Sequence, residues 1–392
     1  MEIDKIIKLR INNENLKEIE KLLTIWRYSV IQKRKGINID DLKIPTTYKV
    51  SLKNFDNFEI PAFHPIAFNT GFSIDFENNT IYITDPEKKY HRIPLKVDEE
   101  NMEYLKKEIE NGAKPTMIMI IPPSYKKGHH KRREIVRNNC WKLHIIVKKN
   151  VELLTKEEFR KFQRISVIGA DLNSKYGIAY SLWIWNTKEN SMKPMKFGFV
   201  KPKLKSHQFQ EIEKWKLQMN HGDAVKYNEL YQRINRKIKR QNIAWIERMS
   251  KMLVDIALNS IKEFDCEIAV ISFENLKDYE SGNNSKKINK KNTEWLRGKI
   301  IQRVFEKSLW INSMKVLTYL PTFNKNQRNL EQILVKAHNT SINCSKCGSK
   351  GKINGRTFEC KCGYKFDKHL NASNNIAKRT IEALITIASP NA

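Results

Sequence analysis

Four cysteines near the end of the chain constrain its fold more than any other feature. Cys344 and Cys347 are separated by two residues, and Cys360 and Cys362 by one, with twelve residues between the pairs. Clustered cysteines in a chain without an export signal indicate metal binding rather than disulfides. Four thiolates at such spacing can surround one Zn²⁺ tetrahedrally. The sequence therefore predicts a structural zinc knuckle over 341–363.

Length and charge limit the number of domains and the class of partner that the chain can have. Its 392 residues allow two or three domains, and 40% hydrophobic residues indicate globular structure. No run reaches the roughly 18 apolar residues of a membrane span, and the first residues do not form a signal peptide. A cytoplasmic protein without a membrane partner is expected. The net charge of +29 favours a polyanionic partner, most simply nucleic acid, although a solvated basic surface is the alternative.

The first part of the chain has mostly the alternating pattern of strands. Residues 15–34 are an exception, because their apolar residues have the spacing of an amphipathic helix. A basic loop is expected between two of the strands, at 122–133. The predicted strands of this region are 4–11, 80–84, 116–122 and 142–147.

The pattern changes near residue 155. Two apolar runs, 165–171 and 267–274, each end in an acid. The order of predicted elements is compatible with a ribonuclease H-like α/β fold: a strand, a strand hairpin, a helix, a further strand and a helix late in the chain. Cys140, Cys266 and Trp245 are expected in cores. The other predicted elements are strands at 178–185, 195–200 and 314–320 and helices at 205–263, 292–312 and 368–386.

Asp171 and Glu274 are the acids at the ends of those two runs. If the strands are neighbours, both carboxylates reach the same sheet edge. Converging carboxylates hold Mg²⁺ ions, which prefer hard oxygen ligands, in sites that hydrolyse phosphodiesters. Alone, an acid that ends an apolar strand is more often a solvated strand end than a metal ligand. The metal-site interpretation of this pair therefore depends on the motifs around the two acids.

Three motifs carry a resemblance to a known family. ADLNSKYGIAYSLW (170–183) and ISFENLKD (271–278) resemble the first two motifs of RuvC-type nucleases. HNTSINCSKCGSKG and RTFECKCGYKFDKHLNASNNIA, within 338–377, resemble the zinc knuckle and third motif of TnpB, a transposon-encoded RNA-guided nuclease related to compact type V CRISPR effectors. The resemblance implies a RuvC-like domain over 160–340 and 364–392. It also implies a strand-rich wedge over 1–155 with a short helical recognition segment near 13–40.

The third motif departs from the family pattern. The family usually has Asp-x-Asp before x-Asn-Ala-Ala, and its metal-binding Asp lies two residues before the Asn. That position is His369 here, and Asp367 lies four residues before Asn371. Asp367 is expected to take over as the third Mg²⁺ ligand, beside Asp171 and Glu274. The alternatives are that His369 is itself a ligand, that cleavage is lost, or that Asp367 caps the helix.

The resemblance also implies partners: a guide RNA and double-stranded target DNA with a short flanking motif. The predicted activity is RNA-guided DNA cleavage with two Mg²⁺ ions and one structural Zn²⁺. A nuclease-inactive, RNA-guided repressor of transcription and an accessory transposon protein remain alternatives. The expected nucleic-acid contacts lie on a helix, at Lys226, Arg233, Arg236, Lys239 and Arg240, and in the basic loop, at Lys126, Lys127, Arg132 and Arg133.

Overall fold

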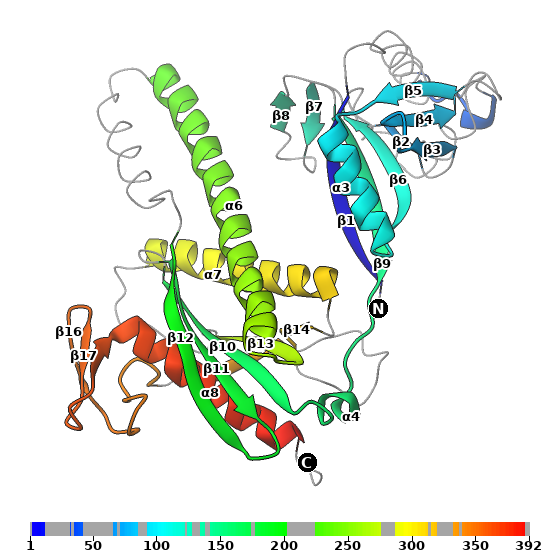
Figure 1. Cartoon of the computed structure of the whole chain (residues 1–392). Helices are drawn as coiled ribbons and strands as arrows, with labels where there is room; N and C mark the ends of the chain where they lie inside the picture. Colours follow the sequence, from blue (N-terminus) through cyan, green and yellow to red (C-terminus); the bar gives the residue numbers. More distant parts are fainter. Residues whose placement is uncertain are drawn as a thin grey trace. The chain divides into compact units, whose positions relative to one another are not determined.

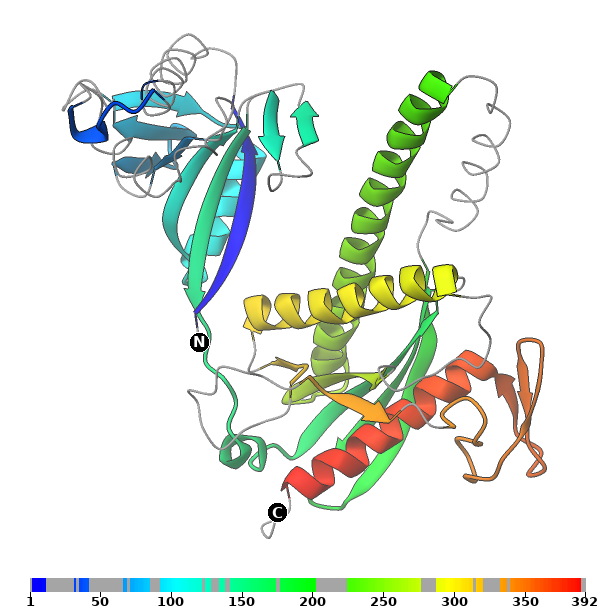
Figure 2. The same cartoon turned by 180° about the vertical axis from the view of Figure 1, so that it is seen from behind.

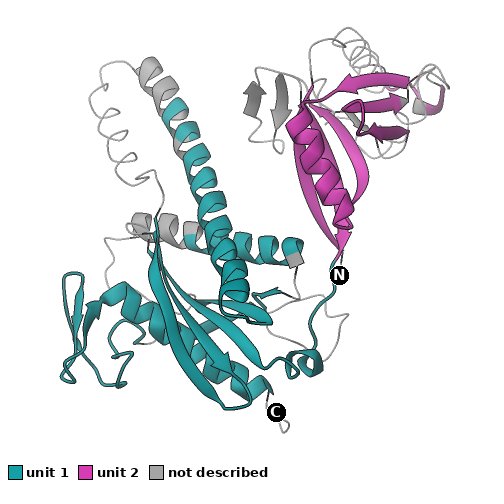
Figure 3. Ribbon diagram, viewed as in Figure 1, with its two compact units in different colours: residues 1, 151–392 teal, residues 2–150 magenta. Residues whose placement is uncertain are grey.

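The chain divides into two compact units, residues 2–150 and 151–392 (Figure 3). The boundary agrees with the composition change near 155, while the identity of the first unit as a wedge stays a prediction. The predicted recognition segment lies largely outside the described residues. The computed structural model describes residues 2–11, 32, 35–41, 66–68, 71–84, 92–121, 124–127, 134–137, 142–173, 177–201, 224–275, 287–312, 315–319, 332–336 and 339–388.

An antiparallel sheet forms the centre of the first unit. Its strand order is β1-β9-β6-β2. Every second residue of β9 is buried, so one face of this sheet is apolar. The strands are β1 (Glu2–Arg10), β9 (Lys142–Asn150), β6 (Lys114–Ile121) and β2 (Ile66–Phe68). A second sheet contains β3 (Phe72–Asp75), β4 (Thr80–Thr84) and β5 (Arg92–Lys96), and a short 3-10 turn, η2, covers Ile39–Asp41.

Two features of this unit differ from the prediction. A helix, α3 (Glu99–Glu110), lies where short strands were expected, and Met102 and Leu105 are its only buried residues. Two apolar anchors among many charges make a weak periodic signal. The expected basic loop contains strand β7 (Ser124–Lys127), which pairs with β8 (Glu134–Arg137).

The second unit is built on a mixed sheet, which confirms the α/β organisation expected for it (Figure 1). Strands β10, β11 and β12 are antiparallel neighbours, whereas β13 runs parallel to β10. The strands are β10 (Arg164–Asn173), β11 (Gly177–Asn186), β12 (Ser191–Val200), β13 (Ile268–Asn275), β14 (Val316–Leu317) and β15 (Leu334–Lys336). The turn helix α4 (Lys156–Phe159) precedes them.

Helices cover both faces of this sheet (Figure 2). Helices α6 (Ala224–Glu263) and α7 (Lys287–Asn312) bury one face in an apolar core. Trp245 and Cys266 are buried in that core, as expected, whereas Cys140 lies outside the described residues. Helix α8 (Lys368–Ala388) packs on β10 and β11. No helix in the described part of the chain is long and apolar enough to cross a membrane.

Helix α8 approaches the sheet closely at Gly169. A Cβ atom at this position would lie 2.3 Å from the Ser373 carbonyl oxygen and 2.4 Å from the Ala377 nitrogen. Only glycine allows backbone to pack on backbone here. Since side chains alternate along a strand, Asp171 lies on the same face of β10 as Gly169, under α8.

A small antiparallel sheet precedes α8. It contains β16 (Lys352–Asn354), β17 (Thr357–Glu359) and β18 (Lys365–Asp367). Cys344 and Cys347 precede β16, and Cys360 and Cys362 lie in the turn between β17 and β18. Phe358 is fully buried beside Cys344 and Cys360. The knuckle is therefore a compact module whose last strand leads directly into α8.

Candidate metal and nuclease site

Asp171 and Glu274 are brought to the same edge of the sheet. The parallel pairing of β10 with β13 joins Ala170 to Phe273, so the next residue of each strand is one of the two acids. Ala170 and Phe273 belong to the core under α6 and α7. Because successive side chains point to opposite faces, Asp171 and Glu274 point to the face that α8 covers.

The surroundings of Glu274 are electrostatically mixed. Burial raises the pKa of its carboxyl, a hydrogen bond from Thr340 lowers the pKa, and the negative charge of Asp171 raises it again. The positive charges of Arg297 and Arg379 act in the lowering direction, but the net direction is upward. Two partly buried carboxylates that repel one another favour a bound cation.

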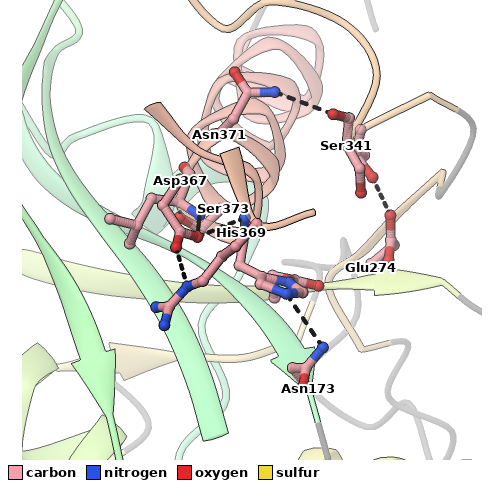
Figure 4. Close-up of polar contacts among 11 residues, drawn as sticks. Asn173, Glu274, Ser341, Asp367, His369, Asn371 and Ser373 are labelled. Carbon is pink, nitrogen blue, oxygen red and sulfur yellow. Dashed lines mark hydrogen bonds and ion pairs between the residues drawn. The ribbon is translucent and has the colours of Figure 1, made fainter. Parts of the chain in front are cut away.

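The third corner of the site is the place beside Asp171 and Glu274 where the third ligand is expected. His369, on the first turn of α8, occupies it. Its Nδ1 atom is 2.8 Å from Asp171 Oδ2, and its Nε2 atom is 3.4 Å from the amide nitrogen of Asn173 (Figure 4). The side chains of His369 and Asp171 are only 12% and 13% exposed. With the Asn173 amide donating to Nε2, the imidazole proton is on Nδ1 and is donated to Asp171.

Asp367 has other partners. Its Oδ1 atom accepts hydrogen bonds from the backbone N–H groups of His369 (2.9 Å) and Leu370 (3.3 Å), which is the geometry of a helix N-cap. Its Oδ2 atom is paired with Arg356 Nε. The N-cap alternative is thus confirmed. That Asp367 also binds Mg²⁺ stays a prediction, and the geometry favours His369 as the residue beside Asp171.

The four knuckle cysteines converge. Their sulfur atoms lie within 4.8 Å of one another, and the Cys344–Cys362 and Cys347–Cys360 Sγ distances are 3.7 and 3.6 Å. A tetrahedron with Zn–S bonds of about 2.3 Å has edges of roughly 3.8 Å. The distances between the sulfur atoms therefore match those around a tetrahedral zinc ion. Hydrogen bonds from the Ser349 backbone and side chain, and from neighbouring cysteines, lower the pKa of Cys347 to about 6. A backbone hydrogen bond from Cys362 lowers the pKa of Cys360, but burial and the neighbouring cysteines raise it to about 12. Cys347 is thus the thiol of this pair that ionises first, and zinc would have to displace the proton of Cys360.

A network of asparagines joins the knuckle to α8, and the sequence analysis did not identify it. Asn371 is fully buried, and its amide nitrogen donates to the carbonyls of Asn343 (2.8 Å) and Ser341 (3.4 Å) (Figure 4). Asn375 donates to the carbonyls of Thr340 (2.7 Å) and Asn343 (2.8 Å). Asparagines at these helix positions, among apolar residues, were the available signal, because buried amides require partners.

The predicted nucleic-acid contacts are only partly described. Arg233, Arg236, Lys239 and Arg240 are exposed on α6. Lys226 lies in the same helix, and Lys126 and Lys127 in β7, but their side chains are not described, and Arg132 and Arg133 lie outside the described residues. Nucleic-acid binding at these positions stays a prediction.

Comparison with known proteins supports the resemblance that the three sequence motifs carry. Residues 324–376 match the family model described as "Cas12f1-like, TNB domain". A TnpB-like protein of Aquifex aeolicus is 28% identical over 223 residues, which cover 53% of this chain and 64% of that protein. The chain thus spans just under two thirds of that relative's length.

Two solved structures have a lower similarity. CasPhi-2 (Cas12j) bound to crRNA has 10% identity and a TM-score of 0.39, over 66% of this chain and 62% of that one. Alicyclobacillus acidoterrestris C2c1 in complex with single-guide RNA has 10% identity and a TM-score of 0.40, over 85% and 58%. The sequence matches therefore carry the comparison. They confirm the predicted resemblance: the chain is similar to TnpB-like proteins, and its residues 324–376 are similar to a domain of a compact type V effector.

Proposed function

We propose that this protein is an RNA-guided DNA endonuclease of the TnpB type, whose second unit is a ribonuclease H-like nuclease domain. One observation carries the proposal: Asp171 and Glu274 each follow the last paired residue of the adjacent parallel strands β10 and β13, and His369 is 2.8 Å from Asp171. A guide RNA and double-stranded target DNA are the proposed partners. The net charge of +29 is in keeping with both.

The donor set fits divalent metal ions. Carboxylate oxygens suit Mg²⁺, and the repulsion between the two acids is the feature that a cation would relieve. When bound, such ions polarise the scissile phosphate and lower the pKa of a bound water. The chain's own contribution is to hold Asp171 and Glu274 in place. His369 orients Asp171 by donating from Nδ1, and α8 packs on β10 and β13, the strands that carry the two acids.

A second function is favoured by His369 itself. Imidazole is a poorer Mg²⁺ ligand than a carboxylate, and here it occupies one oxygen of Asp171. A protein with this corner is also suited to guided DNA binding without cleavage, which would repress transcription at the target. The two functions share partners and differ only in the final hydrolysis.

The test uses the full chain purified with its co-purified RNA and a plasmid library matched to that RNA. Wild type, Asp171→Ala and His369→Asp are compared in Mg²⁺ and in Mn²⁺. The endonuclease proposal expects cleavage by wild type that Asp171→Ala abolishes. Bound but uncut DNA, with cleavage appearing at least tenfold above background in His369→Asp, would instead establish the repressor. Absence of any discrete RNA would contradict both and leave the accessory transposon protein.

A further inference from the structure

Thr340 is in direct contact with Glu274. Its side-chain hydroxyl donates a hydrogen bond to Glu274 Oε1, and the residue is 1% exposed. The Glu274 carboxylate is partly buried, so few water molecules can fix its rotamer. One donor from a rigid neighbour therefore decides which way its oxygens point.

Thr340 directly precedes the knuckle in the chain. The segment 340–345 contains the first cysteine of the cluster, Cys344, and its carbonyls accept the Asn371 and Asn375 hydrogen bonds described above. Two further bonds hold the segment on α8: the Ser345 N–H donates to Asn371 Oδ1 at 2.9 Å, and Lys378 Nζ donates to the Ser345 carbonyl at 2.5 Å. The Cys344 N–H also bonds the Ser349 carbonyl at 2.8 Å, which closes the first knuckle turn.

These contacts form a continuous connection from the sulfur cluster to the carboxylate pair. Cys344 lies four residues after Thr340 on the same segment, and the Thr340 hydroxyl donates to Glu274. We propose that Thr340 is a positioning residue which couples the zinc knuckle to Glu274, so that zinc in the knuckle raises the affinity of the carboxylate pair for divalent cations. The inference rests on the proposed function for the role of that pair. The knuckle would then affect cation binding at the carboxylate pair as well as stabilising its own local structure.

The experiment measures Mn²⁺ affinity of the full chain by calorimetry, with Asp171→Ala subtracted to remove ions bound by co-purified RNA. Thr340→Val removes the donor at nearly constant volume and is expected to weaken Mn²⁺ binding about tenfold, the lower end of the cost of losing a ligand-orienting hydrogen bond. Thr340→Ser keeps the hydroxyl and is expected to bind as wild type does. Thr318→Val is the matched control, since it removes a buried hydroxyl that bonds Ser308 at 2.7 Å elsewhere in the unit.

Zinc depletion supplies the second arm. Wild type stripped of zinc, or carrying Cys347→Ser, is expected to lose Mn²⁺ affinity, while the same treatment of Thr340→Val adds little, because the connection is already broken. Equal Mn²⁺ affinity of Thr340→Val and wild type would overturn the coupling and leave the proposed function intact. A wild type that binds no Mn²⁺ beyond Asp171→Ala would overturn the carboxylate site and the coupling together.

Discussion

At the scale of single residues, the three acids of the site differ in how fully their carboxylate oxygens are paired with protein groups. Asp367 is satisfied on both oxygens, by two backbone N–H groups and by Arg356. Asp171 has the imidazole of His369 and still lies beside a second acid. Unbalanced negative charge thus collects at Asp171 and Glu274, where a cation would be bound, and not at Asp367.

This difference predicts how Asp367 responds to substitution. Asparagine is as good an N-cap as aspartate, so Asp367→Asn is expected to keep the free energy of unfolding within a few tenths of a kcal/mol of wild type, whereas Asp367→Ala lowers it by about 1 kcal/mol. Denaturant unfolding measures both. Mn²⁺ affinity is expected to be unchanged in Asp367→Asn, and a clear loss there would show that Asp367 is a metal ligand after all.

At the scale of elements, the site depends on how closely α8 can approach β10. Gly169→Ala would place a Cβ atom against the α8 backbone. The helix must shift, which is expected to cost on the order of 1–3 kcal/mol and to separate His369 from Asp171. Gly298→Ala is the control, since nothing lies within 4 Å of its added Cβ on helix α7. This exchange is expected to stabilise the protein by about 0.5–1 kcal/mol.

Thermal unfolding and Mn²⁺ affinity separate the two glycine variants. Gly169→Ala is expected to lower both, because the helix carries the third corner of the site. A variant with normal unfolding and normal Mn²⁺ binding would contradict the close packing of α8 on β10.

The elements that the sequence predicts best are those with a local signal. The apolar runs ending in Asp171 and Glu274 correspond to β10 and β13, and the last predicted helix differs from α8 by two residues at its end. The contacts of the third corner could not be predicted, because they depend on the helix approach at Gly169 and not on the spacing of Asp367 and His369 along the chain. Thr340 carries no local signal at all, since only the fold brings it to Glu274.

At the scale of the whole molecule, part of the excess positive charge is clustered on α6. Arg233, Arg236 and Arg240 recur every three or four residues along α6, so they share one face of an exposed helix. Each phosphate contact contributes about 0.9 to the slope of log affinity against log salt for duplex DNA. Charge on this face should therefore be visible in the salt dependence of binding.

The last prediction separates the position of charge from its amount. Replacing Arg233, Arg236, Lys239 and Arg240 by Gln is expected to weaken binding of a labelled duplex of unrelated sequence and to flatten the salt slope by up to about 3.6. The matched control replaces four exposed lysines elsewhere in the same unit, so the net charge changes equally. These are Lys161, Lys188, Lys193 and Lys315, which all lie outside α6.

Titration between 50 and 300 mM salt measures both variants against wild type, at concentrations that span the expected range of non-specific binding. If α6 contacts phosphates, only the α6 variant changes the slope, because released counterions reflect contacts and not net charge. Equal flattening by both variants would mean that the field of the whole surface attracts nucleic acid, and that α6 has no special part in binding it.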